Sequence, residues 1–147
     1  DCTMELKIDR GIKSYDIVDA DGHPAGTIRL NPADPGLAGR WEAVEKELEP
    51  YKGNDISISE TVELDKRIKE KIDYALGSSV SDVLFGGLSC FAMCEDGKLV
   101  FEHILDALSP LIEEAQTTAA KAAEERIKQR TEAYEGSTAG LAPGQAE

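Results

Sequence analysis

The sequence predicts an α+β fold, in which a small N-terminal β-hairpin or meander packs on a helical body that carries a long C-terminal helix. Apolar and polar residues alternate within residues 4–30, as is typical of strands. From about residue 35 onward, apolar residues recur at steps of three and four, as is typical of helices. A chain of 147 residues is the size of one domain, and only eight of its residues are aromatic (three Phe, four Tyr and one Trp), so we expect a mainly aliphatic core.

The N-terminal part, residues 4–30, predicts a hairpin. Residues 15–18 and 27–30 supply two short apolar runs, and between them lies Asp-Ala-Asp-Gly-His-Pro at residues 19–24. Asp and Gly accept the backbone angles of a tight turn, and Pro ends strand pairing. Leu6 and Ile8 also alternate with charged neighbours, so a third strand over residues 4–8 is an open alternative.

The first helix is expected at about residues 35–50. Asp34 is placed to accept the free N–H groups of a helix start, and Pro35 suits the first helical position. Pro50 and Gly53 end the pattern. The buried stripe of this helix consists of Leu37, Trp41, Val44 and Leu48.

Two further helices are expected at about residues 58–76 and 79–85. Ser57 and Glu60 have the spacing of a capping box, and Gly77 suits the left-handed end of a helix. The outer face of the longer helix carries two acid–base pairs at a spacing of four, Glu63 with Arg67 and Asp65 with Lys69. Residues 86–97 are expected to be irregular.

The longest helix is expected to begin at Leu99, with a firmly apolar half at residues 99–112 and a projecting half at residues 115–135. Pro110 lies inside the pattern, where it removes a backbone donor and crowds the preceding turn, so we expect a kink or a break there. We therefore divide the chain into a compact domain at residues 1–114, the projecting helix and a disordered tail at residues 136–147. The tail is almost entirely Gly, Ala, Ser, Thr and Pro.

The charge balance excludes one class of partner. The chain carries 16 basic and 29 acidic residues, a formal net charge of −13, whereas binding to a phosphate backbone needs clustered Lys and Arg.

No apolar run approaches the roughly 20 residues of a membrane span, and no signal peptide is recognisable. We expect a soluble intracellular protein that binds neither nucleic acid nor membranes.

No catalytic, metal or cofactor site is predicted. Aligning Asp19-Ala20-Asp21-Gly22 with a calcium loop puts Ile17 and Ile28 where carboxylates are needed, so a hairpin turn is favoured. Cys90 and Cys94 are favoured as small apolar side chains in a buried loop, while a redox pair or a metal site stays open. The two His residues lie in no recognisable nucleophile signature, so we expect a protein that is not an enzyme.

The second half of the long helix is the predicted partner-binding surface. From Ala115 to Ala123 only Ala lines its apolar seam, and burial of Ala contributes little compared with about 1.5–3 kcal/mol for Leu or Ile. This half is therefore held weakly by its own domain and is available to a partner or to a second copy, the alternative being a solvated helix. The candidate residues are Ala115, Ala119, Ala122, Ala123, Arg126, Ile127, Arg130 and Tyr134.

The arrangement resembles the tail assembly chaperones of long-tailed bacteriophages and prophages over most of residues 4–135. The similar features are the strand pair leading into residues 31–37 (Asn-Pro-Ala-Asp-Pro-Gly-Leu), the turn at residues 83–86 (Val-Leu-Phe-Gly), the segment from Gly97 to Ile112, and a mixed-charge helix that ends near Tyr134. The Ala-lined seam and the Cys90/Cys94 pair depart from the family pattern.

The resemblance implies a protein absent from the virion that acts in the cytoplasm of the bacterial host. Its partner would be the tape-measure protein, whose long hydrophobic helices it keeps soluble, and also the major tail protein, whose polymerisation into the tail tube it promotes. Self-association and a longer frameshifted form are also implied by the resemblance. The alternative is a structural tail or connector subunit retained in the virion.

Overall fold

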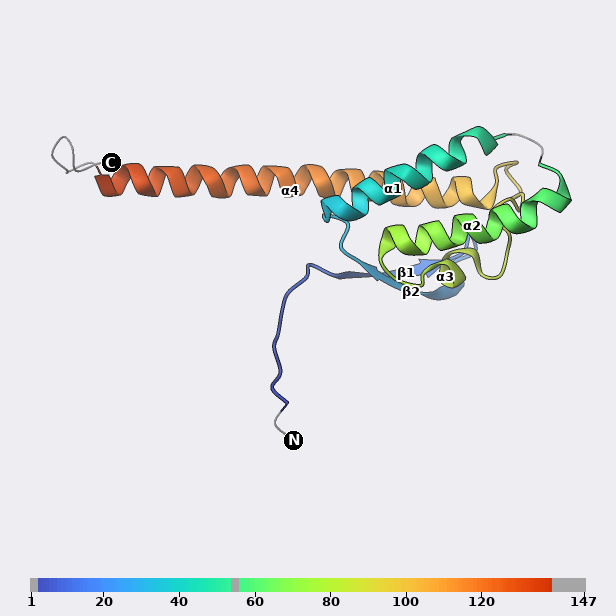
Figure 1. The fold of residues 1–147 in the computed structure, drawn as a ribbon, viewed down its shortest axis with the longest axis horizontal. Helices are drawn as coiled ribbons and strands as arrows, with labels where there is room; N and C mark the ends of the chain where they lie inside the picture. The colour runs from blue at the N-terminus through green and yellow to red at the C-terminus, as the bar shows by residue number, and fades with distance from the viewer. Residues whose placement is uncertain (1–2, 54–55, 139–147) are drawn as a thin grey trace.

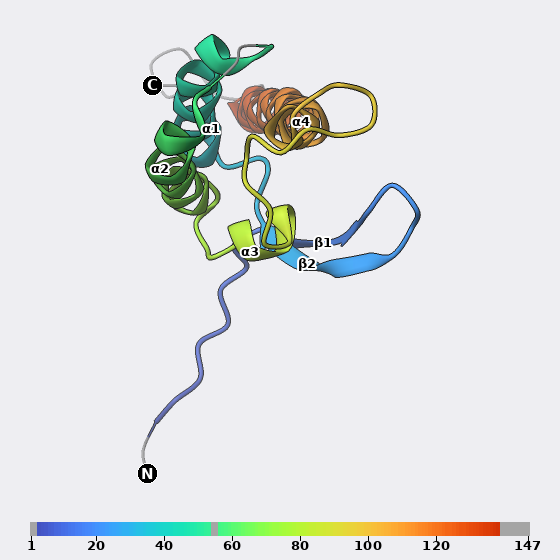
Figure 2. The same ribbon diagram turned by 90° about the vertical axis from the view of Figure 1, so that its right-hand side faces the viewer.

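The computed structural model describes residues 3–53 and 56–138, and it confirms the α+β fold (Figure 1). The elements are β1 (Lys13–Val18), β2 (Pro24–Leu30), α1 (Pro35–Leu48), a short 3-10 helix η1 (Glu49–Tyr51), α2 (Ile58–Leu76), α3 (Ser81–Phe85) and α4 (Val100–Thr138). Seen nearly along α4, helices α1 and α2 lie to one side, and the hairpin lies below with α3 (Figure 2).

The hairpin is antiparallel and has two strands. Tyr15 pairs with Ile28 and Lys13 pairs with Leu30, so one face of the hairpin turns Ile28 and Leu30 into the core. The third strand considered for residues 4–8 is wrong, because residues 3–12 form no regular secondary structure and leave the body (Figure 1). Alternation of apolar residues shows that a segment suits a strand, but pairing also requires a neighbouring edge within reach.

Helix α1 begins as its capping residue predicts. The Asp34 carboxylate accepts a hydrogen bond from the Gly36 N–H at 2.9 Å, and Pro35 follows at the first helical position. All four stripe residues are buried, namely Leu37, Trp41, Val44 and Leu48. The stripe prediction is confirmed, and helix α1 packs through it.

Helix α2 has the predicted bounds but not the predicted cap. Ser57 is its capping residue, yet the hydroxyl makes no capping hydrogen bond and lies 3.4 Å from the Ser59 hydroxyl instead. Gly77 ends the helix in the left-handed conformation, with φ of 82°. Asp65 and Lys69 form the expected ion pair at 3.1 Å, whereas Arg67 turns to Glu47 of α1, also at 3.1 Å.

Helix α3 is shorter than expected and begins at Ser81. Asp73 of α2 sets this start, since its carboxylate accepts the N–H groups of Val80 and Ser81 at 2.8 and 2.7 Å and also the Ser81 hydroxyl at 2.9 Å. Residues 86–97 contain no helix, as predicted, and α4 starts at Val100, one residue after the expected Leu99. An isolated antiparallel bridge joins Met93 to Leu99.

Helix α4 runs without interruption through Pro110, so the break considered there does not occur. Proline has no N–H, so the carbonyl of Asp106, four residues before Pro110, has no helical donor. Asp106 and Pro110 are both exposed, so water can bond to that carbonyl. Leu105, Leu108 and Ile112 anchor the helix on both sides of the proline. The expected disordered tail begins too early, because Gly136–Thr138 are helical; its remainder, 139–147, lies outside the described residues.

The core lies between α1, α2, α4 and the buried face of the hairpin. It is mainly aliphatic, as expected, with Trp41, Phe85 and Phe101 as its buried aromatic residues. Phe91 bridges outward from it, since its ring meets those of Phe101 and Tyr51 edge to face, each at 5.8 Å between centroids. This core holds the first part of α4, up to Ile112, and the end of the helix extends beyond it.

Candidate functional site

The candidate site is a surface of α4, and it has two parts with different surroundings. Up to Ala119 the helix keeps half-buried or buried side chains, whereas every side chain from residue 120 to residue 136 is exposed. We call residues 120–136 the outer segment of α4. Figure 1 shows the helix extending far beyond the rest of the fold in this direction.

The inner part borders a groove between α4 and the hairpin, which we call the hairpin groove. Its volume is ≈ 530 Å³, and one wall is formed by Lys13 and Tyr15 of β1 with the loop Asn31–Ala33. The other wall is the stretch of α4 from Pro110 to Ala122. Because that stretch presents Ala115, Ala119 and Ala122, its small side chains leave the groove open.

The loop in the first wall of the groove, Asn31–Ala33, is fixed to α4. The Gln116 side-chain amide donates to the Pro32 carbonyl oxygen at 3.0 Å, and Pro32 is buried. Asn31 accepts the Ala33 N–H through its side-chain oxygen at 2.9 Å, which closes a local turn. The groove is therefore held by specific contacts and is present before any partner binds.

The eight predicted partner-binding residues fall in two groups. Ala115, Ala119 and Ala122 line the hairpin groove, which thus reaches the start of the outer segment. The other five lie further along the outer segment, where a shallow depression is lined by Ala123, Arg126, Ile127 and Arg130. Tyr134 lies further along the same segment and is 58% exposed.

The apolar side chains of residues 3–10 form a surface that the sequence prediction missed. Met4, Leu6 and Ile8 are 87, 83 and 75% exposed. Their alternation with charged residues is the signal in the sequence, but alternation alone favours a strand in the protein's own sheet as readily as an exposed arm. We call residues 3–10 the N-terminal arm.

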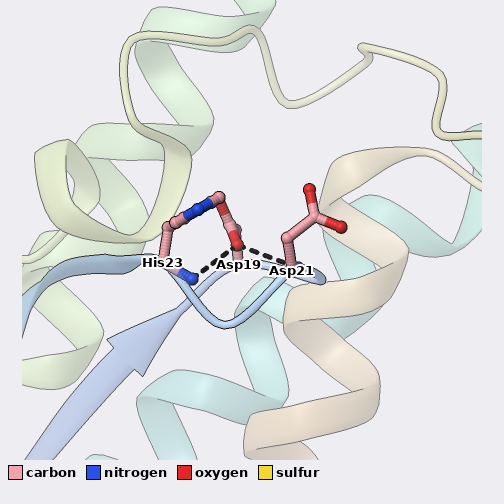
Figure 3. Close-up of side chains that lie close together, drawn as sticks. All are labelled: Asp19, Asp21 and His23. Carbon is pink, nitrogen blue, oxygen red and sulfur yellow. Dashed lines mark hydrogen bonds and ion pairs between the residues drawn. The ribbon is translucent and has the colours of Figure 1, made fainter.

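The acidic hairpin turn brings three potential metal ligands together (Figure 3). Ligand atoms of Asp19, Asp21 and His23 lie within 4.8 Å of one another, and all three residues are exposed. One oxygen of Asp19 already accepts the N–H groups of Asp21 and His23, each at 2.9 Å, while its other oxygen lies 3.4 Å from His23 Nδ1. These contacts build the predicted hairpin turn.

Cys90 and Cys94 have different surroundings. Cys90 is fully buried and Cys94 is half-buried, and both are free thiols. Burial, together with the neighbouring Asp65 carboxylate, raises the pKa of the Cys90 thiol far above its ordinary value. A thiol kept protonated in the core is a poor nucleophile and a poor metal ligand, so the favoured interpretation is confirmed for Cys90.

Comparison of the chain with family models, with curated proteins and with solved structures gives no match. Among the described residues, no helix combines the length and the apolar character that crossing a membrane requires.

Proposed function

We propose that this protein is a bacteriophage tail assembly chaperone. In the cytoplasm of the bacterial host, it would bind the tape-measure protein, keep that protein soluble and promote polymerisation of the major tail protein around it. The observation that carries the proposal is the outer segment of α4, in which every side chain is exposed, including the large apolar Ile127, 65% exposed, and Tyr134. Binding, without catalysis or a cofactor, is the proposed activity.

The outer segment has the spacing of a helix-recognition surface. Ala123, Ile127, Arg130 and Tyr134 follow one another at steps of four, three and four, which places them on one side of the helix. A helical client would lay its own apolar face along such a row, and the small Ala123 would permit a close approach of the two backbones.

The charges of this region suit a temporary partner. Within residues 115–135 there are four basic and four acidic side chains, whereas the whole chain carries −13. A charge-balanced helix can meet an acidic or a basic client without strong repulsion, while the acidic body keeps the complex soluble. Both properties are those that a chaperone for an aggregation-prone helical protein requires.

Co-expression with a candidate tape-measure protein tests the proposal. The full chain should increase the soluble fraction of that client, and Ile127→Asp should abolish the increase. Val62→Asp is the matched control, because Val62 is 69% exposed but lies on α2. The proposal fails if the client's solubility is unaffected by the full chain, or if Ile127→Asp and Val62→Asp behave alike.

A structural tail or connector subunit is the second candidate function. It is favoured by the two-stranded sheet, whose outer strand edges have no further strand in the described part of the chain, so that subunits could pair edge to edge in a ring. Quantitative mass spectrometry of purified particles separates the two functions. A stoichiometric amount in particles supports the structural subunit, and absence from particles supports the chaperone.

A further inference from the structure

The N-terminal arm has the alternating apolar and charged residues of a β-strand, but it belongs to no sheet. Its apolar residues Met4, Leu6 and Ile8 alternate with Glu5, Lys7 and Asp9, so an extended arm has one apolar face and one charged face. All residues of the arm are exposed, and both views show it running away from the body (Figures 1 and 2). Three large apolar side chains are thus held in water.

The direction of the arm is set at its root. The Asn31 side-chain amide donates to the Arg10 carbonyl oxygen at 2.9 Å, and the Gly11 N–H donates to Asp9 at 2.8 Å. Gly11 has a φ of 68°, and a Cβ at this position would lie 2.7 Å from the Asn31 side-chain nitrogen. This anchored turn sends the arm away from its own hairpin groove.

The hairpin groove has an unpaired strand edge and an apolar wall, and the arm has neither a strand partner nor an apolar surface to pack against. Strand β1 pairs only with β2 among the described residues, so the backbone groups along its other edge have no strand partner. Lys13 and Tyr15 bring that edge to the groove, and Leu111 with the alanines of α4 forms the apolar wall beyond it. An extended segment laid there could pair with β1 and bury its apolar side chains against α4.

We propose that the N-terminal arm of one copy of this protein occupies the hairpin groove of a second copy, as a third strand along β1. Apolar residues face one another in an antiparallel register that sets Ile8 opposite Tyr15 and, at the root of the arm, Arg10 opposite Lys13. Leu6 then faces Ile17, and Lys7 lies opposite Asp16, on the outer face of the hairpin.

Exchange of arms also determines how copies assemble. Each copy has one arm and one groove, so the contact is either reciprocal, in a dimer, or passes from copy to copy in a ring or chain. Each copy carries a net charge of −13, so repulsion between bodies opposes association, and added salt should strengthen it. Of the outer segment of α4 only Ala122 lines the groove, so the contact lies apart from Ile127 and Tyr134 and does not depend on the proposed client.

Sedimentation velocity of the full chain over a range of protein and NaCl concentrations tests the arm. The wild type should form species larger than a monomer, and Leu6→Asp should sediment as a monomer. Ile58→Asp is the control, because Ile58 is 87% exposed, close to the 83% of Leu6, but starts α2. A wild type that is monomeric throughout, or a Leu6→Asp variant that assembles like the wild type, overturns the proposal.

A labelled peptide of residues 3–10 tests the groove. The Leu6→Asp chain has a disabled arm and an intact groove, so it should bind the peptide; adding Ala119→Arg to that chain, which fills the groove, should abolish binding. Adding Ile127→Asp should leave peptide binding unchanged, which separates this contact from the client surface. Equal binding by the Ala119→Arg chain, or no binding by the Leu6→Asp chain, contradicts the proposal. Circular dichroism of each variant verifies that it is folded.

Discussion

The indole N–H of Trp41 donates a hydrogen bond to the Ser109 hydroxyl at 2.9 Å and thereby joins α1 to α4 one residue before Pro110. Ser109 in turn donates to a carboxylate oxygen of Glu45 at 2.8 Å. Trp41 is 1% exposed, so its N–H has little access to water. This relay fixes the base from which the outer segment of α4 extends.

Ser109→Ala should destabilise the fold by about 1–3 kcal/mol, because the buried indole donor then loses its partner. Urea unfolding followed by the fluorescence of the single tryptophan measures the change. Thr117→Ala is the control, since the Thr117 hydroxyl bonds only to the Glu113 carbonyl of its own helix and is exposed. Equal losses in the two variants would show that the relay contributes nothing.

Pro110→Ala should stabilise the protein. Proline within a helix costs about 3 kcal/mol relative to alanine, and α4 passes through Pro110 without interruption, so the substitution restores a backbone hydrogen bond that the fold already accommodates. A rise in the midpoint of thermal unfolding is expected, with unchanged helix content by circular dichroism. A fall in the midpoint would mean that the proline ring itself makes a stabilising contact at the hairpin groove.

Acid should weaken the link between α1 and α2 through Glu47. The hydrogen bond from Lys71, with the further ion pair from Arg67, lowers the pKa of Glu47 below its ordinary value of 4.5. A lowered carboxyl pKa stabilises the fold above the unfolded pKa, and this stabilisation is lost as pH falls through the folded pKa.

Glu47→Gln should therefore reduce the free energy of unfolding at pH 7, by up to about 1 kcal/mol given the partly exposed partners, and should match the wild type once pH is well below 4.5. Urea titrations at a series of pH values measure the difference. Glu42→Gln breaks an exposed pair with Lys46 and should change the free energy of unfolding at pH 7 less than Glu47→Gln does.

Gly26→Ala should be more destabilising than Gly22→Ala. Gly26 has a φ of 141°, and a Cβ there would lie 3.0 Å from both methyl groups of Val83 on α3. Gly22 also has positive φ, but a Cβ would meet nothing within 4 Å. Backbone strain is common to both, so the excess loss for Gly26→Ala reports on the packing of the hairpin against α3. In a Val83→Ala background this excess should shrink; if it persists, the clash is not its cause.

Thiol labelling should distinguish the two cysteines of the loop that precedes α4. Cys94 should react with a maleimide in the folded protein, whereas Cys90, which is buried and has a raised pKa, should react only after unfolding. Peptide mapping by mass spectrometry assigns the label to each residue. Labelling of Cys90 at the rate of Cys94 in native buffer would contradict the buried position.

Features that depend on neighbours a few residues apart were predictable from the sequence. The stripe from Leu37 to Leu48, the Asp34 cap and the Gly77 helix end each follow from periodicity or from local hydrogen bonding, which the sequence alone determines. The small side chains along the seam of α4 can also be read from the sequence, because side-chain size is a property of each residue.

Features that depend on distant segments were decided only by the tertiary structure. Arg67 pairs with Glu47 across two helices, and the alanines of α4 form a groove only because β1 lies opposite them. The alternating arm remains unpaired because Asn31 and Gly11 direct it away from the hairpin. Periodicity reports which face of a segment is apolar, but the surface that this face meets is set by chain segments brought together in the fold.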